Sequence, residues 1–234
     1  MRPLPDDVVV RLQGVSRIYP QGGNQVAALS DIDLDIRRGE FVALVGPSGS
    51  GKTTLLNMIG GLDRPTSGRI WIGDTDITGL SQAALAQVRL RRIGFVFQEY
   101  NLIPVLSALE NVEYVMLLQG VPEKPRRERA LALLGELGLA GMEHRRPSEL
   151  SGGQQQRVAV ARAIVSEPLI VLPDEPTANL DSVAGTALLD LMREMNEKKG
   201  VTFVFSTHDP LVMQRAKRII RMRDGRIVES VLQG

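Results

Sequence analysis

A glycine-rich turn between a short apolar run and a helical pattern is the first segment of this sequence that could do chemistry. The apolar run covers 41–45, and the turn reads Gly46-Pro47-Ser48-Gly49-Ser50-Gly51-Lys52-Thr53-Thr54. Glycines let successive backbone N–H groups curve around phosphate oxygens at the positive end of the following helix. In loops of this kind the lysine reaches the β- and γ-phosphates and the threonine hydroxyl binds Mg²⁺. The sequence therefore predicts a site for a nucleoside triphosphate with Mg²⁺, and Lys52 is a predicted catalytic residue.

Two adjacent carboxylates, Asp174 and Glu175, follow a second apolar run at 169–172. Successive apolar residues are typical of a buried parallel strand, whose carboxyl end opens on the ligand crevice of an α/β sheet. A carboxylate beside the γ-phosphate can act on the attacking water. Pro173, which precedes the pair, donates no backbone hydrogen bond, so either strand pairing ends at Leu172 or the local geometry differs there.

A second possible phosphate contact lies at Ser151-Gly152-Gly153-Gln154, a turn that opens a helical pattern. The first N–H groups of a helix carry the positive end of its dipole and therefore suit a phosphate. A phosphate loop by itself occurs in many unrelated ATPases and GTPases. The two motifs together fit far fewer protein families than the phosphate loop does by itself.

These motifs, in this order along the chain, resemble the ATP-binding cassette (ABC) transporter family over about residues 19–224. The finer resemblance is to the ATPase subunits of macrolide export, lipoprotein release and cell division. It implies an enzyme that hydrolyses ATP, with ATP and Mg²⁺ as cofactors, and that works as an ATP-sandwich homodimer. In such a dimer, Ser151, Gly152, Gly153 and Gln154 of one copy contact the ATP held by the other copy's phosphate loop. The dimer drives separate integral membrane permease subunits, for export or for the transmission of mechanical force.

The resemblance also implies roles for single residues that carry little signal alone. Asp174 resembles the aspartate that holds Mg²⁺ through water, and Glu175 resembles the catalytic glutamate that polarises the attacking water. Gln98 resembles a glutamine that contacts Mg²⁺ and the nucleotide, and His208 resembles a catalytic histidine that hydrogen-bonds the γ-phosphate. Asp181 resembles the aspartate of a loop that signals across the dimer, although it could also cap the helix that follows it.

Tyr19 stands where the family has an aromatic residue that stacks on adenine. Stacking needs only a flat face, so a tyrosine suffices for this predicted ATP contact. A half-buried structural ring is the alternative. A second open question concerns the apolar segment 100–106, which we expect to dock a membrane subunit if exposed. Its side chains Leu102, Ile103 and Leu106 could instead belong to a core.

The elements needed to position these residues predict an α/β fold. With the resemblance, this is a P-loop NTPase cassette with a parallel-sheet core, an antiparallel β subdomain and an α-helical subdomain. We expect a single domain over 1–234, with the core and the antiparallel subdomain at about 8–97 and 158–234. The helical subdomain, carrying the Ser151–Gln154 turn, is expected at about 99–157. Strand-like runs lie at 28–36, 41–45, 68–73, 93–97, 169–172 and 201–205, and helical patterns lie at 53–59, 129–137, 158–165 and 182–198.

Composition excludes several classes of partner and location. The chain has 28 basic and 27 acidic residues, a net charge of +1, which gives no electrostatic footprint for nucleic acid. No apolar stretch approaches the roughly 18 residues that span a bilayer, and the first residues lack the pattern of a secretory signal. We therefore expect a cytoplasmic protein, peripheral on the cytoplasmic face of the inner or plasma membrane through its membrane subunits.

Two alternatives belong to other classes of protein. A soluble ABC ATPase of DNA repair or translation usually joins two cassettes or inserts long coiled coils, and this sequence contains neither. A P-loop kinase for a small substrate would leave the Ser151–Gln154 turn unexplained. An assay for a phosphorylated acceptor separates that kinase from an ATPase.

Overall fold

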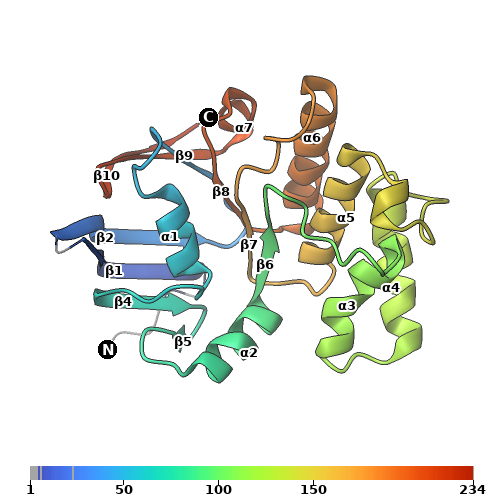
Figure 1. The fold of residues 1–234 in the computed structure, drawn as a ribbon, viewed down its shortest axis with the longest axis horizontal. Coiled ribbons are helices and arrows are strands. Elements are labelled where there is room, and N and C mark those ends of the chain that lie inside the picture. The colour runs from blue at the N-terminus through green and yellow to red at the C-terminus, as the bar shows by residue number, and fades with distance from the viewer. Residues whose placement is uncertain (1–4, 6, 23, 234) are drawn as a thin grey trace.

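The computed structural model describes residues 5, 7–22 and 24–233. Residues 1–4, 6, 23 and 234 lie outside the described part. They include both ends of the predicted domain and most of the segment that was considered as a secretory signal. The described elements form two sheets and a helical layer (Figure 1). The strands are β1 (Val8–Gln21), β2 (Asn24–Arg37), β3 (Phe41–Val45), β4 (Ser67–Ile72), β5 (Thr75–Asp76), β6 (Ile93–Val96), β7 (Ile170–Pro173), β8 (Phe203–Ser206), β9 (Arg218–Arg223) and β10 (Arg226–Leu232). The helices are α1 (Lys52–Ile59), α2 (Gln82–Arg92), α3 (Ala108–Leu118), α4 (Glu123–Glu136), α5 (Gly152–Ile164), α6 (Ser182–Lys199) and α7 (Pro210–Arg215), with a 3₁₀ turn at Pro147–Glu149.

The central sheet has the strand order β10-β9-β3-β8-β7-β6, in which only β10 pairs antiparallel. Strand β3 is buried along its whole length because both of its faces are covered. Phe41, Ala43 and Val45 pack into a core shared with α3 to α6, whereas Val42 and Leu44 pack into a core shared with α1 and the antiparallel sheet. The continuous apolar pattern of this strand therefore reflects burial on two sides.

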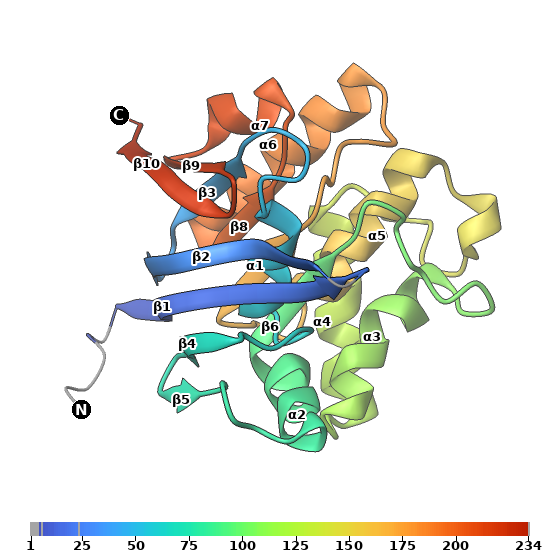
Figure 2. The same cartoon turned by 60° about the vertical axis from the view of Figure 1, so that its left-hand side comes forward.

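The second sheet is antiparallel, with the order β2-β1-β4-β5. Figure 2 shows its two long strands, β1 and β2, crossing in front of α1. Apolar residues from both strands pack with α1 in one buried core. This sheet is the predicted antiparallel β subdomain, and it brings β1 and β2 close to the helix that begins at the phosphate loop.

The helical layer consists of α3, α4 and the adjoining part of α5, on the side of the central sheet away from the antiparallel sheet (Figure 1). Ser107 caps α3, and the Glu110 side chain accepts a hydrogen bond from the backbone N–H of Ser107, which completes a capping box. Helix α5 extends from the Ser151–Gln154 turn into the central core, so the predicted boundary at 157 falls inside this helix. Within the described residues, we find no helix both long and apolar enough to cross a membrane.

The sequence pattern did not predict α2. Between its ends only Leu85 is buried, and its last turn carries three arginines, so the apolar stripe that marks a helix is nearly absent. Its start is fixed by Ser81, whose side chain accepts a hydrogen bond from the Ala84 N–H. Helix α2 therefore depends on its cap and its contact with the neighbouring strand β6 more than on periodicity.

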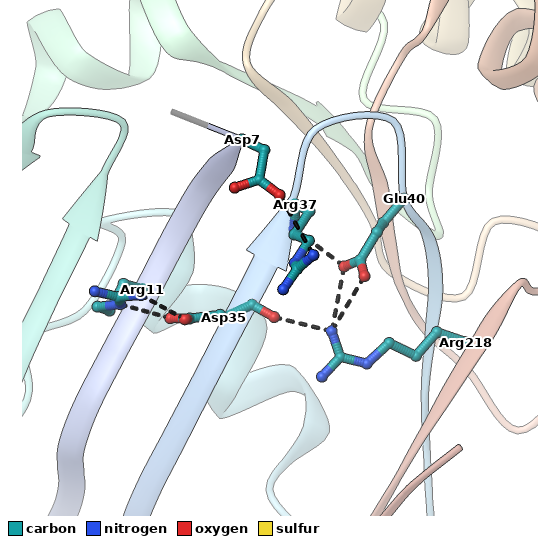
Figure 3. Close-up of polar contacts among 6 residues, drawn as sticks. All are labelled: Asp7, Arg11, Asp35, Arg37, Glu40 and Arg218. Atoms are coloured by element: carbon teal, nitrogen blue, oxygen red, sulfur yellow. Dashed lines mark hydrogen bonds and ion pairs between the residues drawn. The ribbon is translucent and has the colours of Figure 1, made fainter. Parts of the chain in front are cut away.

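A network of charged side chains joins the two sheets (Figure 3). Arg11 of β1 donates two hydrogen bonds to the carboxylate of Asp35 on β2, at 2.7 and 2.5 Å. The guanidinium of Arg218, on β9 of the central sheet, donates to the backbone carbonyl of Asp35 at 2.9 Å and to the Glu40 carboxylate at 3.3 Å. At the edge of the same network, Nη1 of Arg37 lies 3.4 Å from Oδ2 of Asp7. These contacts fix the antiparallel sheet against the sheet that carries the phosphate loop.

Candidate active site

The phosphate loop is built from backbone that only glycine can adopt at two positions. Gly51 has φ +99°, and a Cβ atom there would lie 2.6 Å from the carbonyl oxygen of Ala28. A Cβ atom at Gly46 would lie 2.3 Å from the carbonyl oxygen of Met222. Both distances are too short for a side chain. The backbones of β2 and β9 therefore lie directly against the backbone of the loop. The loop is thereby held open toward the start of α1.

Lys52 lies across this loop. Its ammonium group donates to the carbonyl oxygens of Gly46 and Pro47, at 2.8 and 3.1 Å. These contacts hold the positive charge beside the backbone N–H groups of the loop and the first turn of α1. The position suits an incoming phosphate, which can take over the ammonium hydrogen bonds.

A cavity of about 580 Å³ opens above the loop. Its lining residues are Ala28, Gly46, Pro47, Ser48, Gly49, Ser50, Gly51, Lys52, Thr53, Thr54, Gln98, Glu175, Ala178 and His208. We call it the nucleotide cavity. The fold thus brings Gln98, Glu175 and His208, which are far apart in sequence, to the predicted phosphate loop. Tyr19 is not among the lining residues.

Glu175 is held by hydrogen bonds from the segment that follows β8. The Thr207 hydroxyl donates to its Oε2 at 3.2 Å, and the backbone N–H of His208 donates to the same oxygen at 3.4 Å. The Nδ1 atom of His208 lies 2.7 Å from Oε1. The backbone of Glu175 has φ +46°, which is uncommon outside glycine and typical of functional sites. The carboxylate is therefore oriented by its own backbone and by the segment that follows the neighbouring strand β8.

Asp174 directly follows β7 and is partly buried, as is Glu175. Burial raises the pKa of its carboxyl, the Glu175 charge acts in the same direction, and Ser206, Thr53 and Lys52 oppose the rise. Its Oδ1 atom is buried without a hydrogen-bond partner. A buried carboxylate oxygen with no partner, near the Thr53 hydroxyl, is the oxygen donor set that Mg²⁺ takes together with phosphates. These residues fit the implied metal ion.

Strand pairing does not end at Leu172, which was one of the two possibilities for Pro173. The pairing of β7 with β6 continues through Pro173, opposite Val96, and Asp174 forms a bridge with Ser206 beyond it. On the β8 side, the Val171 N–H donates to Thr202 at 2.8 Å and the Glu175 N–H donates to Ser206 at 2.9 Å. Because successive residues of a strand alternate in direction, the proline nitrogen falls between these two bonds. The hydrogen bond that Pro173 cannot donate is therefore missing between two hydrogen bonds that do join β7 to β8.

The Ser151–Gln154 turn lines a different cavity, of about 340 Å³, which we call the signature cavity. Its lining residues are Gly138, Ser151, Gly152, Gly153, Gln154, Arg157, Asn179, Leu180, Asp181 and Ala184. Ser151 and Gln154 form a capping box at the start of α5. The Asp181 side chain accepts a hydrogen bond from Ala184 N–H at 2.8 Å, so its predicted capping role is observed. The two cavities share no lining residue.

Three polar residues tie the segment after β6 to α5 and to the loop before α6. Asn179 belongs to the loop that the resemblance identified together with Asp181, whereas Gln156 and Arg162 had no predicted role. Gln156 is buried and donates to the carbonyl oxygen of Pro176 at 2.7 Å. The Asn179 side chain donates to the carbonyl oxygen of Gln98 at 2.9 Å. Arg162 donates to the carbonyls of the two residues at 100 and 101, at 3.1 and 2.6 Å. In the sequence, Gln156 does not differ from the neighbouring glutamines of α5, and Arg162 is marked only as a polar residue among the apolar ones of the second half of the helix.

The segment 100–106 is divided between core and surface. Leu102 packs against the large buried core, so for this residue the core alternative holds and not the docking surface. Ile103 and Leu106 are half-buried, whereas Val105 is 70% exposed. The buried Asn111 holds this segment through hydrogen bonds with the backbone of Ile103 and Leu106. Val105 is thus presented to solvent on a fixed turn.

Comparison with known proteins agrees with this geometry. The family model for "ABC transporter" matches residues 29–178. The chain is 49% identical to an uncharacterized ABC transporter ATP-binding protein of Thermotoga maritima, over 94% of this chain and 93% of that protein. It is also 49% identical to the macrolide export ATP-binding/permease protein MacB of Escherichia coli, over 94% of this chain. The chain spans 34% of the length of that MacB protein.

Solved structures give the same picture. The dimeric, post-hydrolysis ATP-binding cassette MJ0796 bound to ADP and Pi has a TM-score of 0.87 and 43% identity, covering 96% of this chain and 99% of that one. The cbiO1 subunit of the cbiONQ transporter from Clostridium perfringens has a TM-score of 0.85 and 30% identity, covering 96% and 88%. The chain therefore belongs to the ABC transporter family. It is an ATP-binding ATPase cassette with the P-loop NTPase fold, and the resemblance to macrolide-export ATPases is confirmed.

Proposed function

We propose that this ABC transporter ATPase hydrolyses ATP at sites shared by two copies of the chain and so drives separate integral membrane permease subunits. The observation that carries the proposal is the separation of the nucleotide cavity from the signature cavity. One chain holds a phosphate loop with a carboxylate beside it, and elsewhere holds the helix start suited to a phosphate. A second copy, turned to face the first, completes both sites.

At each site the residues divide the work between binding and proton transfer. Lys52 and the loop N–H groups bind the β- and γ-phosphates, and Thr54 adjoins them in the cavity lining. Glu175 orients the attacking water and accepts its proton, because it lies in the same cavity and is aimed by Thr207 and His208. His208 exchanges its contact with Glu175 for one with the γ-phosphate once the nucleotide is bound.

The proposed metal site uses Asp174, Thr53 and Gln98. These residues would hold Mg²⁺, with Asp174 acting through water, and the ion would supply positive charge to the phosphate oxygens. The orphaned Oδ1 atom of Asp174 supports this assignment.

Binding energy from ATP favours the closed dimer only if ATP contacts the closed form better than the open one. The Ser151–Gln154 turn of the second copy provides that extra contact in our proposal, so ATP closes the dimer and hydrolysis releases it. Asp181 lines the same signature cavity as Ser151, a position suited to signalling between copies.

The permease would contact the turn that carries Val105. The nearby helix α3 adds exposed apolar side chains at Tyr114, Leu117 and Leu118, which are 38 to 56% exposed. Exposed apolar residues of this kind mark contact surfaces. Such a partner would hold the chain at the cytoplasmic face of a membrane. Val105→Glu tests this contact better than a change at Leu102, which packs against the core, and it should abolish co-purification with the permease while ATP affinity stays unchanged.

The experiment that tests the function follows ATP turnover by the purified chain. We expect inorganic phosphate and ADP to appear in equal amounts with no added acceptor, and turnover to rise more than linearly with protein concentration because two copies form each site. Transfer of phosphate to a small acceptor would instead identify the kinase alternative. Turnover strictly proportional to concentration down to the lowest detectable level would contradict the shared site.

A further inference from the structure

A cluster of three side chains, Arg17, Tyr19 and Asp63, lies outside both cavities and is not explained by phosphate chemistry. The Tyr19 hydroxyl donates to Oδ2 of Asp63 at 2.5 Å. The Arg17 guanidinium lies 2.9 Å from Oδ1 of the same carboxylate. The guanidinium carbon of Arg17 is 4.4 Å from the centre of the Tyr19 ring. One carboxylate thus binds the ring's hydroxyl and the cation that covers one of its faces.

This cluster lies beside the nucleotide cavity. Tyr19 pairs with Val26 of β2, two residues from Ala28, which lines the cavity. A strand rises about 3.3 Å per residue, so the ring is attached roughly 7 Å along β2 from the point of contact with the loop. The carbonyl oxygen of Ala28 abuts Gly51 of the phosphate loop. The ring is therefore within the length of a nucleoside from the predicted phosphate site.

Asp63 is linked to the phosphate loop through α1. This helix begins at Lys52, and the turn after it carries Asp63, whose backbone N–H donates to Asn57 in the helix at 3.4 Å. The side chains of Arg17 and Asp63 are 24% and 26% exposed, so their interaction is only partly screened by solvent. The Nε atom of Arg17 is buried without a hydrogen-bond partner, which leaves Asp63 and the Tyr19 ring as the contacts that orient the guanidinium.

We propose that Asp63 is a positioning residue for the nucleobase. It fixes the Tyr19 hydroxyl and holds Arg17 against one ring face, so that the other face is presented to a purine. The proposal rests on the proposed ATPase function and on the stacking of Tyr19 on the base, which the family resemblance implies. Because stacking reads a flat surface and not the edge of the base, the site should accept adenine and guanine alike.

A purely structural role makes a different prediction. If Asp63 only fastens the turn after α1 to β1, its loss should weaken binding of every phosphate ligand through the shared helix. If it positions the ring, its loss should weaken only ligands that carry a base. Inorganic tripolyphosphate has the phosphates without the base and therefore separates the two.

The experiment measures binding of ATP, GTP and tripolyphosphate to the full chain by calorimetry. Tyr19→Leu should weaken ATP binding about tenfold, in the range found for base stacking on aromatic rings. Asp63→Ala should weaken ATP and GTP binding by at least about threefold and leave tripolyphosphate binding unchanged. Asp63→Asn keeps an acceptor for the Tyr19 hydroxyl and should lose less than Asp63→Ala.

Asp74→Asn is the matched control, because Asp74 also pairs with an arginine, at 2.6 Å, but is 84% exposed on a turn between β4 and β5. It should leave all three affinities unchanged. The proposal is overturned if Asp63→Ala binds ATP as the parent chain does, or if it loses ATP and tripolyphosphate affinity to the same extent. If Tyr19→Leu also binds ATP normally, the stacking role fails as well, whereas the assignments of Lys52 and Glu175 do not depend on it.

Discussion

The nucleotide cavity and the signature cavity differ in what they contain, although both end at a helix start. The nucleotide cavity, of about 580 Å³, is lined by a lysine, a carboxylate and the glycine-rich loop. The signature cavity, of about 340 Å³, is lined by glycines, by Arg157 and Asp181, and by a helix start where the Ser151 hydroxyl accepts a hydrogen bond from the Gln154 N–H. In the proposed function, the first cavity binds ATP and orients the attacking water, and the second adds a contact to the ATP of the other copy. The proposal therefore assigns the chemistry to one cavity and the coupling to the other.

The largest effect that would sharpen this difference comes from Glu175→Gln. We expect turnover to fall by about 10² to 10⁴, the usual contribution of a general base, with ATP affinity retained. Without hydrolysis the ATP-bound dimer should accumulate and elute as a dimer on size exclusion. A variant that stays monomeric with ATP and hydrolyses at the parent rate would remove Glu175 from the mechanism.

Lys52→Ala acts on the same cavity but on binding. Its ammonium contacts two loop carbonyls now and the phosphates in the complex. Hydrogen bonds to a charged group contribute about 1.5 to 3 kcal/mol, so ATP affinity measured by calorimetry should fall by roughly 10- to 100-fold. Undiminished affinity would show that the loop backbone alone binds the phosphates.

Ser151→Ala tests the other cavity. It should leave ATP binding to the monomer unchanged and weaken ATP-driven dimerisation by about tenfold, the value of one hydrogen bond to phosphate. Ser107→Ala is the matched control, since Ser107 forms the same capping box on α3 outside both cavities. Each change should cost about 1 kcal/mol of stability as a lost helix cap. Equal dimerisation by the two variants would mean that Ser151 only caps its helix.

The pKa of Asp174 gives a prediction with a definite sign. Burial raises this pKa, so the folded chain binds the proton more tightly than the unfolded chain does. The ionised carboxylate therefore lowers stability at pH 7, and this loss disappears as the pH falls toward the ordinary aspartate value of about 4. Asp174→Asn should raise the melting temperature of the nucleotide-free chain at pH 7, and the gain should shrink on acidification.

Asp74→Asn should change the melting temperature in the opposite direction or not at all, because the Arg92 hydrogen bond lowers the pKa of Asp74. It should not raise the melting temperature at pH 7. A gain for Asp174→Asn that grows on acidification would contradict the burial account of its pKa.

The smallest effect is expected for Pro173→Ala. The bonds made by Val171 and Glu175 to β8 hold the strand on both sides of the proline, so the position of Glu175 should hardly change. ATPase activity should change by less than about tenfold, which corresponds to roughly 1.4 kcal/mol of barrier. A larger loss in steady-state turnover would show that the proline itself sets the position of the two carboxylates.

Local sequence patterns made four features of the site predictable: the phosphate loop, the Ser151–Gln154 turn, the loop that carries Asp181, and the carboxylate pair. Strand β3 was predicted with its observed bounds, since burial on both faces leaves an unbroken apolar run. The contacts that orient these groups could not be predicted. Asp63 meets Tyr19 across 44 residues, and Thr207 meets Glu175 across 32. Such pairs arise where the fold brings the turn after α1 to β1 and the ends of β7 and β8 side by side, and they have no periodicity along the chain.

Helix α2 and Pro173 show two further limits. Helix α2 was missed because one buried leucine does not make an apolar stripe. The pairing through Pro173 was open because proline at a strand end and proline within a ladder look alike in sequence. In both cases tertiary contacts, with β6 and with β8, decide the outcome.

The central claim, that two copies share each site, is tested most directly by mixing two inactive variants. Lys52→Ala removes phosphate binding, and Gly153→Asp places a negative charge in the signature cavity, where a Cβ atom meets only Ala184, at 3.4 Å. In a mixed dimer one site combines both defects and the other combines the two intact halves. At equal amounts the mixture should recover roughly a quarter of the parent ATPase activity, since about half the dimers are mixed and each has one intact site. Activity of the mixture no greater than that of the separate variants, at concentrations where the parent chain dimerises, would contradict the account.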